Sequence, residues 1–161
     1  MKRIYRAGLY LRLSKEDGEK EESNSIESQR NILLRYLDDS DEIEYVKEYV
    51  DDGYTGTNFN RPGFQSMFSD LQKGIINCVL VKDLSRFGRN YVDSGKYMQQ
   101  IFLDMGIRFI AVNDNVDTKD ACEKGFDLMV PLKNLFNESY SQDLSCKVQS
   151  SFKAMQRAGL F

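Results

Sequence analysis

The chain has 161 residues, 41% of them hydrophobic, which is enough to bury the core of one domain. It contains no histidine, and this absence excludes a Ser-His-Asp triad, a Cys-His nucleophile pair and a histidine-ligated zinc site. Its 22 basic and 25 acidic residues give a net charge of −3. That balance argues against a domain that holds DNA by bulk charge alone, but it allows a local basic site.

The spacing of the cysteines and the length of the apolar runs indicate a reducing, cytoplasmic compartment. Cys78, Cys122 and Cys146 lie far apart and form no CxxC pair, so we expect reduced thiols in a cytoplasm rather than a disulfide or zinc framework. No apolar run approaches ~18 residues and the N-terminus has no signal-peptide core. We therefore expect a cytoplasmic protein that has no membrane partner.

Strand patterns alternate with helix patterns along the first two thirds of the chain. Residues 6–13 alternate in polarity, 38–52 suit a strand with one solvated face, and 75–81 and 107–112 are almost continuously apolar. Helical stripes lie between these strands. They run from Ile26 to Leu37 with a cap near Asn24 or Ser25, from Phe64 to Leu71 ending at Gly74, and from Tyr91 to Met105 ending at Gly106. This order predicts an α/β fold with a central, largely parallel sheet flanked by helices.

The last part of the chain has a different pattern. Apolar residues recur every four positions over residues 132–158 without glycine or proline, which predicts a helix of roughly 40 Å that extends from the domain. Such a stripe needs a partner, so we expect a dimer interface; a helix packed on its own sheet is the alternative. We divide the chain into residues 1–125, an α/β domain, and 126–161, a long helix that continues into segments absent from this sequence.

The first strand carries a candidate site on one face. Because side chains alternate along a strand, Tyr10, Arg12 and Ser14 point together. A serine two residues beyond an arginine is a candidate nucleophile beside an anion-binding group, although a serine at a strand end is often only a cap.

Two further groups follow later strands. The first group is a turn-rich loop made of Asp51 to Gly56 and Asn60 to Gly63. We expect a helix to begin at Pro62, so Arg61 lies just before its N-terminus, which favours anions. After the buried strand, Arg86 and Arg89 are three residues apart, and we expect them to share a face of a helical turn. The carboxyl ends of parallel strands meet at one edge of a sheet. A serine with four arginines and no histidine suits phosphoryl transfer.

The motifs Y-L-R-L-S, D-D-G-Y-T-G-T-N-F-N-R-P-G-F and V-K-D-L-S-R-F-G-R-N occur in this order. Together they resemble the catalytic domain of serine site-specific recombinases, most of all the large, transposon-excision branch encoded on mobile elements. The resemblance implies a resolvase-like fold, no cofactor or metal, and a double-stranded DNA recombination site as partner. It also implies a homodimer through the long helix and a tetramer during strand exchange.

The resemblance also implies roles for individual residues. Ser14 would attack a DNA phosphodiester and form a 5′-phosphoserine link, after which strands are exchanged and rejoined. Further site residues would be Arg12, Arg86 and Arg89 around the scissile phosphate, Arg61 as an assisting group, Tyr10 and Gln29 lining the site, and Asp52 as the acidic residue before the glycine turn.

Two departures from the family pattern leave alternatives open. Ser85 stands where small resolvases carry an aspartate, so the acid for the leaving group is unassigned. Glu138 matches a helix glutamate, but Ser139 and Gln142 follow where an arginine is usual, which would suit a catalytically impaired assembly module. A third hypothesis is a flavodoxin-like receiver with Asp51 or Asp52 as phosphoacceptor and Lys82 as its partner.

Overall fold

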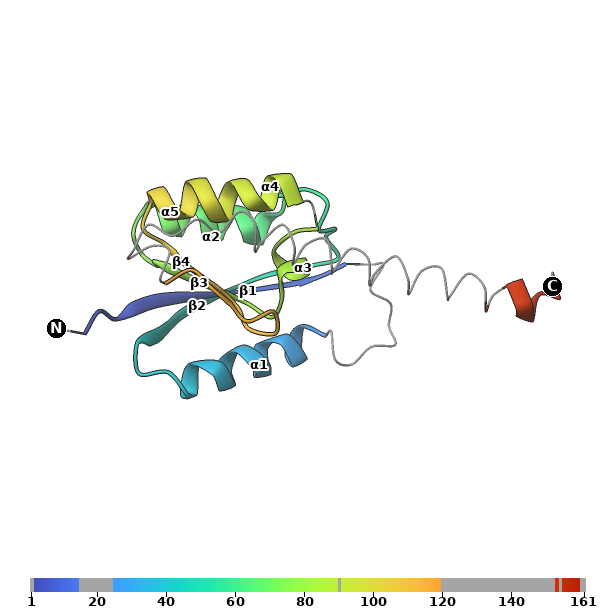
Figure 1. Cartoon of the computed structure of the whole chain (residues 1–161), viewed down its shortest axis with the longest axis horizontal. Coiled ribbons are helices and arrows are strands. Elements are labelled where there is room, and N and C mark those ends of the chain that lie inside the picture. The colour runs from blue at the N-terminus through green and yellow to red at the C-terminus, as the bar shows by residue number, and fades with distance from the viewer. Residues whose placement is uncertain (1, 15–24, 90, 120–152, 154, 160–161) are drawn as a thin grey trace.

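The computed structural model describes residues 2–14, 25–89, 91–119, 153 and 155–159. Its core is a five-stranded sheet of order β2-β1-β3-β4-β5 (Figure 1). The strands are β1 (Tyr5–Leu13), β2 (Ile43–Asp52), β3 (Cys78–Val81), β4 (Arg108–Ala111) and β5 (Val116–Asp117). All neighbours pair in parallel except β4 and β5, which are antiparallel. The predicted α/β fold with a largely parallel sheet is confirmed, and only the two-residue β5 was not expected.

Helices cover both faces of the sheet. They are α1 (Ile26–Asp38), α2 (Pro62–Gln72), α3 (Leu84–Phe87), α4 (Tyr91–Gly95), a π-helical stretch (Lys96–Ile101) and α5 (Phe102–Asp104). Figure 1 shows α1 alone on one face and α2, α4 and α5 on the other. Each face has its own core cluster: Leu33 and Leu37 of α1 join one, and Phe64 and Met67 of α2 join the other. The sheet is therefore buried on both sides, as its apolar strands predict.

The two longer helices begin where their sequences predict. The Ser25 hydroxyl accepts a hydrogen bond from the backbone N–H of Ser28 at 3.1 Å and so caps α1. Pro62 occupies the first turn of α2, where its missing N–H has no helical partner to lose. The predicted third helix is a succession of α4, the π-helical stretch and α5. Met98 and Phe102 are buried in it, whereas Met105, expected on the same stripe, is 39% exposed.

An irregularity in β2 decides which side chains face the site. Ala7 pairs with Tyr45 but Gly8 pairs with Lys47, so β2 holds one extra residue, Val46, relative to β1. A one-residue bulge moves all later side chains to the opposite face. Ile43, before the bulge, accordingly packs in the α1 cluster, whereas Tyr49, after it, packs in the α2 cluster.

The predicted long C-terminal helix lies almost wholly outside the described residues. So do the boundary between residues 1–125 and 126–161, the positions Glu138, Ser139 and Gln142, and two of the three cysteines. The described residues of this part, 153 and 155–159, include a helical turn that ends at Gly159 (φ 71°). Across the described portion of the chain, no helix has the length and apolarity to cross a membrane.

Candidate active site

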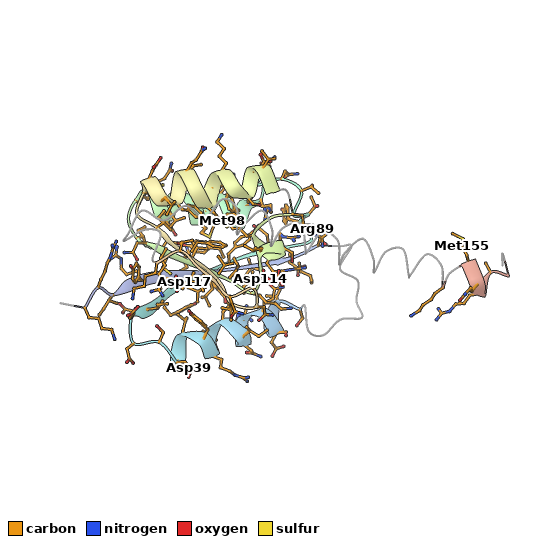
Figure 2. The ribbon with its side chains drawn as sticks, in the orientation of Figure 1. Asp39, Arg89, Met98, Asp114, Asp117 and Met155 are labelled. Carbon is orange, nitrogen blue, oxygen red and sulfur yellow. The ribbon has the colours of Figure 1, made fainter. Side chains whose placement is uncertain are left out.

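The three predicted motifs meet at one edge of the sheet, where β1, β2 and β3 end. Ser14 follows directly after β1 and is only 5% exposed. Arg12 lies beside Asp51 in the β1–β2 register, so their side chains share a face. Arg89, after β3, lies at the same end of the domain (Figure 2). The edge thus gathers residues far apart in sequence, as open α/β sheets commonly do at the carboxyl ends of their strands.

The fully buried Arg12 joins all three motifs through main-chain oxygens. Its Nε donates to the carbonyl of Arg86 at 3.1 Å, Nη1 to Tyr54 at 3.0 Å and Nη2 to Ser85 at 2.6 Å. Burial, with the neighbouring Arg86 charge, lowers the Arg12 pKa to about 10. The guanidinium therefore stays charged at neutral pH, and it fixes the third motif and the turn after β2 against β1.

Arg86 completes a reciprocal pair with Arg12. Its Nη1 donates to the carbonyl oxygen of Arg12 at 3.0 Å, and the same oxygen accepts from Gln29 Nε2 of α1, also at 3.0 Å. The Arg12 N–H returns a bond to Gln29 Oε1 at 3.3 Å. Gln29 and Arg86 are both buried. The backbone just before Ser14 is thus held from two sides.

The short helix α3 depends on contacts at its N-terminus. Asp83 accepts from the backbone N–H of Arg86 at 3.1 Å and also from the Ser85 hydroxyl. Asp114, from the turn between β4 and β5, accepts from Leu84 N at 2.7 Å. A helix of four residues cannot stabilise itself, so these two carboxylates and Arg12 hold it in place.

Arg86 and Arg89 do not share a helical turn, contrary to the expectation from their spacing. The helix ends at Phe87 because Gly88 is fully extended, with φ −174° and ψ 150°. Arg89 instead lies on the next segment, where its backbone N–H bonds the Gly56 carbonyl at 2.9 Å. The two arginines therefore approach the site from different segments.

A buried network lies beneath the arginines. The Tyr10 hydroxyl donates to Asp51 Oδ2 at 2.7 Å and accepts from Arg61 Nη1 at 2.6 Å. Arg61 Nη2 donates to the Phe87 carbonyl at 2.8 Å and Nε to Asn58 O at 2.8 Å. Burial raises the pKa of the Tyr10 hydroxyl above its ordinary value, so it keeps its proton.

Asp51, rather than the expected Asp52, belongs to this network. Asp51 is 1% exposed and faces Tyr10, whereas Asp52 pairs with Leu13 and is exposed. Successive residues of a strand face opposite sides, so only Asp51 can join the Tyr10 network; the role that the family resemblance implies for Asp52 stays a prediction. The sequence pattern did not show that Asp51 belongs to this network, because the bulge at Val46 reverses the alternation.

The sequence profile described as "Resolvase, N terminal domain" matches residues 7–160. The chain belongs to this family. Among solved structures, a resolvase family site-specific recombinase from Streptococcus pneumoniae is 27% identical, with a TM-score of 0.59, over 96% of this chain and 98% of that one. The C-terminal catalytic domain of ISC1926 TnpA, an IS607-like serine recombinase, is 25% identical with a TM-score of 0.55, over 66% and 70% of the two chains.

Two further comparisons agree with the family. The N-terminal catalytic domain of TP901-1 integrase shares the fold, with a TM-score of 0.65 and 23% identity over 86% of this chain and 98% of that one. A putative DNA recombinase of Bacillus subtilis strain 168 is 29% identical over 100 residues, which make up 62% of this chain and 18% of that protein. The chain thus spans less than a fifth of the length of this relative.

The resolvase domain brings most of the expected site residues together. Buried at the edge are Tyr10, Arg12, Ser14, Gln29, Arg61 and Arg86. Arg89 is half-buried and Asp52 lies outside the group. The main-chain oxygens of Tyr54, Ser85 and Phe87 were not anticipated, since no side-chain pattern marks a carbonyl as an acceptor. The receiver hypothesis is set aside by the family match.

Proposed function

We propose that this domain cuts and rejoins DNA strands as the catalytic domain of a site-specific recombinase, with Ser14 as nucleophile. The observation that carries the proposal is the position of Ser14, directly after β1 and two residues beyond Arg12, whose guanidinium and carbonyl both bond the Arg86 segment. The family match and the recombinases of similar fold and sequence support the DNA substrate.

The reaction is a transesterification at phosphorus. The Ser14 Oγ–P bond forms while the P–O3′ bond breaks; the serine hydroxyl loses one proton and the leaving 3′ oxygen gains one. The DNA 5′ end remains as a phosphoserine ester, and attack by a 3′ hydroxyl of another strand reverses the step. Positive charge around the phosphate offsets the negative charge spread over its oxygens. We assign this role to Arg86 and Arg89. The segments that carry these two arginines are positioned by four further residues: Arg12, Arg61, Tyr10 and Gln29.

The partners that we propose follow the family and the sequence pattern. They are a double-stranded recombination site, a second copy that pairs through the helix predicted over residues 132–158, and a tetramer at the time of strand exchange. Because the chain carries a net charge of −3, we propose that other segments of the full-length protein supply most of the affinity for DNA. We propose a bacterial cytoplasm as the location.

The test follows covalent protein–DNA adducts formed by the intact protein. The substrate is a supercoiled plasmid that carries the genomic DNA on both sides of its gene, called here the flanking-DNA plasmid. Ser14→Ala should abolish the adduct while the circular dichroism spectrum is unchanged. The control is Ser66→Ala, on the exposed face of α2, which should form the adduct normally. An adduct with Ser14→Ala would reject Ser14 as nucleophile.

The alternative is an assembly module that has lost catalysis, which the absence of arginine between Arg108 and Arg157 favours. In that case the unsubstituted protein forms no adduct, and arginine introduced by Ser139→Arg or Gln142→Arg should restore one. Adduct formation by the unsubstituted protein would exclude this alternative.

A further inference from the structure

A continuous hydrogen-bonded chain runs from β2 to the segment that carries Arg86. It passes from Asp51 to the Tyr10 hydroxyl, then to Arg61, and ends on the carbonyl of Phe87, the last residue of α3. We propose that Asp51 is a positioning residue that sets the placement of the arginine segment through Tyr10 and Arg61. This inference rests on the proposed function, because the segment it positions is the one assigned to the phosphate.

Asp51 is itself fixed by helix α2. Its Oδ1 accepts from Gly63 N at 2.7 Å and its Oδ2 from Phe64 N at 2.9 Å. These N–H groups belong to the first helical turn, which has no internal acceptors, and the residue at the cap position, Arg61, supplies none from its side chain. A Cβ on Gly63 would come within 2.9 Å of the carboxylate. The carboxylate therefore has one position, set by the end of α2.

Arg61 is held equally closely. It is 1% exposed, and its guanidinium carbon lies 4.8 Å from the ring centre of Phe59 and 5.5 Å from those of Tyr10 and Phe64. Nε, Nη1 and Nη2 each donate to an acceptor: Asn58 O, Tyr10 Oη and Phe87 O. An arginine enclosed in this way acts on substrate through what it holds, which is the end of α3.

The opposite charges of Asp51 and Arg61 explain why the placement of Arg61 depends on Asp51. The Arg61 guanidinium lies in a buried aromatic setting, where an uncompensated charge is costly. The compensating carboxylate is that of Asp51, and Tyr10 links the two by accepting from Arg61 and donating to Asp51. In Asp51→Asn, Arg61 loses its counter-charge, and one of the two oxygens that accept from Tyr10, Gly63 and Phe64 becomes an NH2 group that cannot accept. The bond from Arg61 to the Phe87 carbonyl is then less firmly positioned.

The protein contains a matched pair for comparison. The Tyr49 hydroxyl donates to Asp70 Oδ2 at 2.6 Å, so this tyrosine–aspartate pair joins β2 to α2, whereas Tyr10 and Asp51 join β1 to β2. Asp70 also accepts from the exposed Lys47 side chain at 3.5 Å. Asp70→Asn and Tyr49→Phe therefore remove the same kind of tyrosine–aspartate bond at another place, without touching the chain to Phe87.

The kinetic experiment compares Asp51→Asn and Tyr10→Phe with Asp70→Asn and Tyr49→Phe in the intact protein. The flanking-DNA plasmid is used at saturating and limiting concentrations. Asp51→Asn should lower the rate constant of adduct formation at saturation by 10- to 100-fold and leave the half-saturating DNA concentration within twofold. Both control variants should stay within twofold in both quantities. Because Asp51 and Tyr10 act along one chain, the double variant should be no slower than the slower single variant.

A spectroscopic measurement needs no DNA. In protein labelled with [15N]arginine, the Arg61 Nε–H resonance should shift and exchange with solvent at least tenfold faster in Asp51→Asn, but not in Asp70→Asn. If Asp51→Asn does not fold because the α2 cap is lost, Tyr10→Phe leaves that cap intact and breaks the next link.

The outcomes separate the two proposals. If no variant, nor the unsubstituted protein, forms an adduct, the proposed function fails and the arginine resonances alone decide the positioning role. If the adduct forms and Asp51→Asn reacts as fast as Asp70→Asn, the positioning role is rejected while the proposed function stands. An unchanged Arg61 resonance in both Asp51→Asn and Tyr10→Phe rejects it as well.

Discussion

Arg12 and Arg86 bind each other's main chain: Arg12 Nε donates to the Arg86 carbonyl at 3.1 Å, and Arg86 Nη1 donates to the Arg12 carbonyl at 3.0 Å. Two like charges are held together because each guanidinium is directed at a carbonyl dipole of the other residue rather than at the other charge. The pair is a two-way link between the end of β1 and helix α3, so neither segment can shift without breaking a bond to a charged donor.

Arg86→Lys should therefore lower the rate of adduct formation by 10- to 100-fold. A lysine keeps the charge but presents a single ammonium rather than a planar fork, so it cannot keep both the Arg12 carbonyl and a phosphate oxygen. A tenfold rate loss corresponds to about 1.4 kcal/mol of barrier. The measurement is the single-turnover rate on the flanking-DNA plasmid. Arg35→Lys, on the exposed side of α1, is the control, and equal rates for the two variants would contradict the prediction.

Gly56→Ala should impair catalysis more than folding. A Cβ there would lie 2.7 Å from Arg12 Nη2 and 3.0 Å from Arg89 Cγ, closer than packed atoms tolerate. The neighbours that must move are two arginine side chains of the site, so we expect a loss of activity of at least tenfold with a small change in the unfolding free energy.

Gly74→Ala provides the opposite case. Gly74 has φ +73°, and within the described part of the chain no side chain lies within 4 Å of the place that an alanine methyl group would take. Alanine therefore costs about 1 kcal/mol of backbone strain without touching the site. Urea unfolding and adduct formation on both variants would show the contrast. Full activity of Gly56→Ala would show that the close approach to Arg12 has no catalytic consequence.

Ser25→Ala should destabilise the domain by about 1 kcal/mol, the usual cost of a lost N-cap. Ser25 supplies the hydroxyl that accepts from Ser28 N, and α1 is the helix that covers one face of the sheet. The midpoint of urea unfolding measures the effect, with Ser66→Ala as the matched control. Equal midpoints for the two variants would mean that the cap contributes nothing.

Acid should remove the contribution of Glu42 to stability. A hydrogen bond from Lys119, with help from Arg108, lowers the pKa of the Glu42 carboxyl below its ordinary value. A carboxyl with a depressed folded-state pKa stabilises the fold above its unfolded pKa, and this contribution is lost as the pH falls through the folded pKa. Glu42→Gln should therefore lower the melting temperature at pH 7, and the difference should shrink as the pH falls below the ordinary glutamate pKa of about 4.3. Glu44→Gln, at an exposed position of β2, should show no such dependence, and a constant deficit for Glu42→Gln would contradict the assignment.

Much of the fold could be predicted because local chemistry decides it. The Ser25 cap, Pro62 in the first turn of α2 and the apolar run of β3 depend on neighbours in the chain, and the structure has all three. β5 could not be predicted, because a strand of two residues has no periodicity.

The candidate site was predicted less completely, for reasons of geometry. The choice between Asp51 and Asp52 depends on the bulge at Val46, and a single extra residue leaves no mark in a strand that is mostly exposed. The separation of Arg86 from Arg89 depends on the extended backbone of Gly88, which ends α3 at Phe87, two residues before Arg89. Spacing along the chain showed which residues gather, but not which atoms they bind.

The place of β1 in the sheet has a mechanical consequence. β1 pairs with β2 along all nine of its residues and with β3 along part of its length, both in parallel, and Ser14 follows directly at its end. If a DNA end joined to Ser14 pulls along the strand axis, the load falls on the hydrogen bonds of both ladders at once, in shear, instead of opening them one after another. A strand paired on both sides, as β1 is, therefore resists such tension better than an edge strand would.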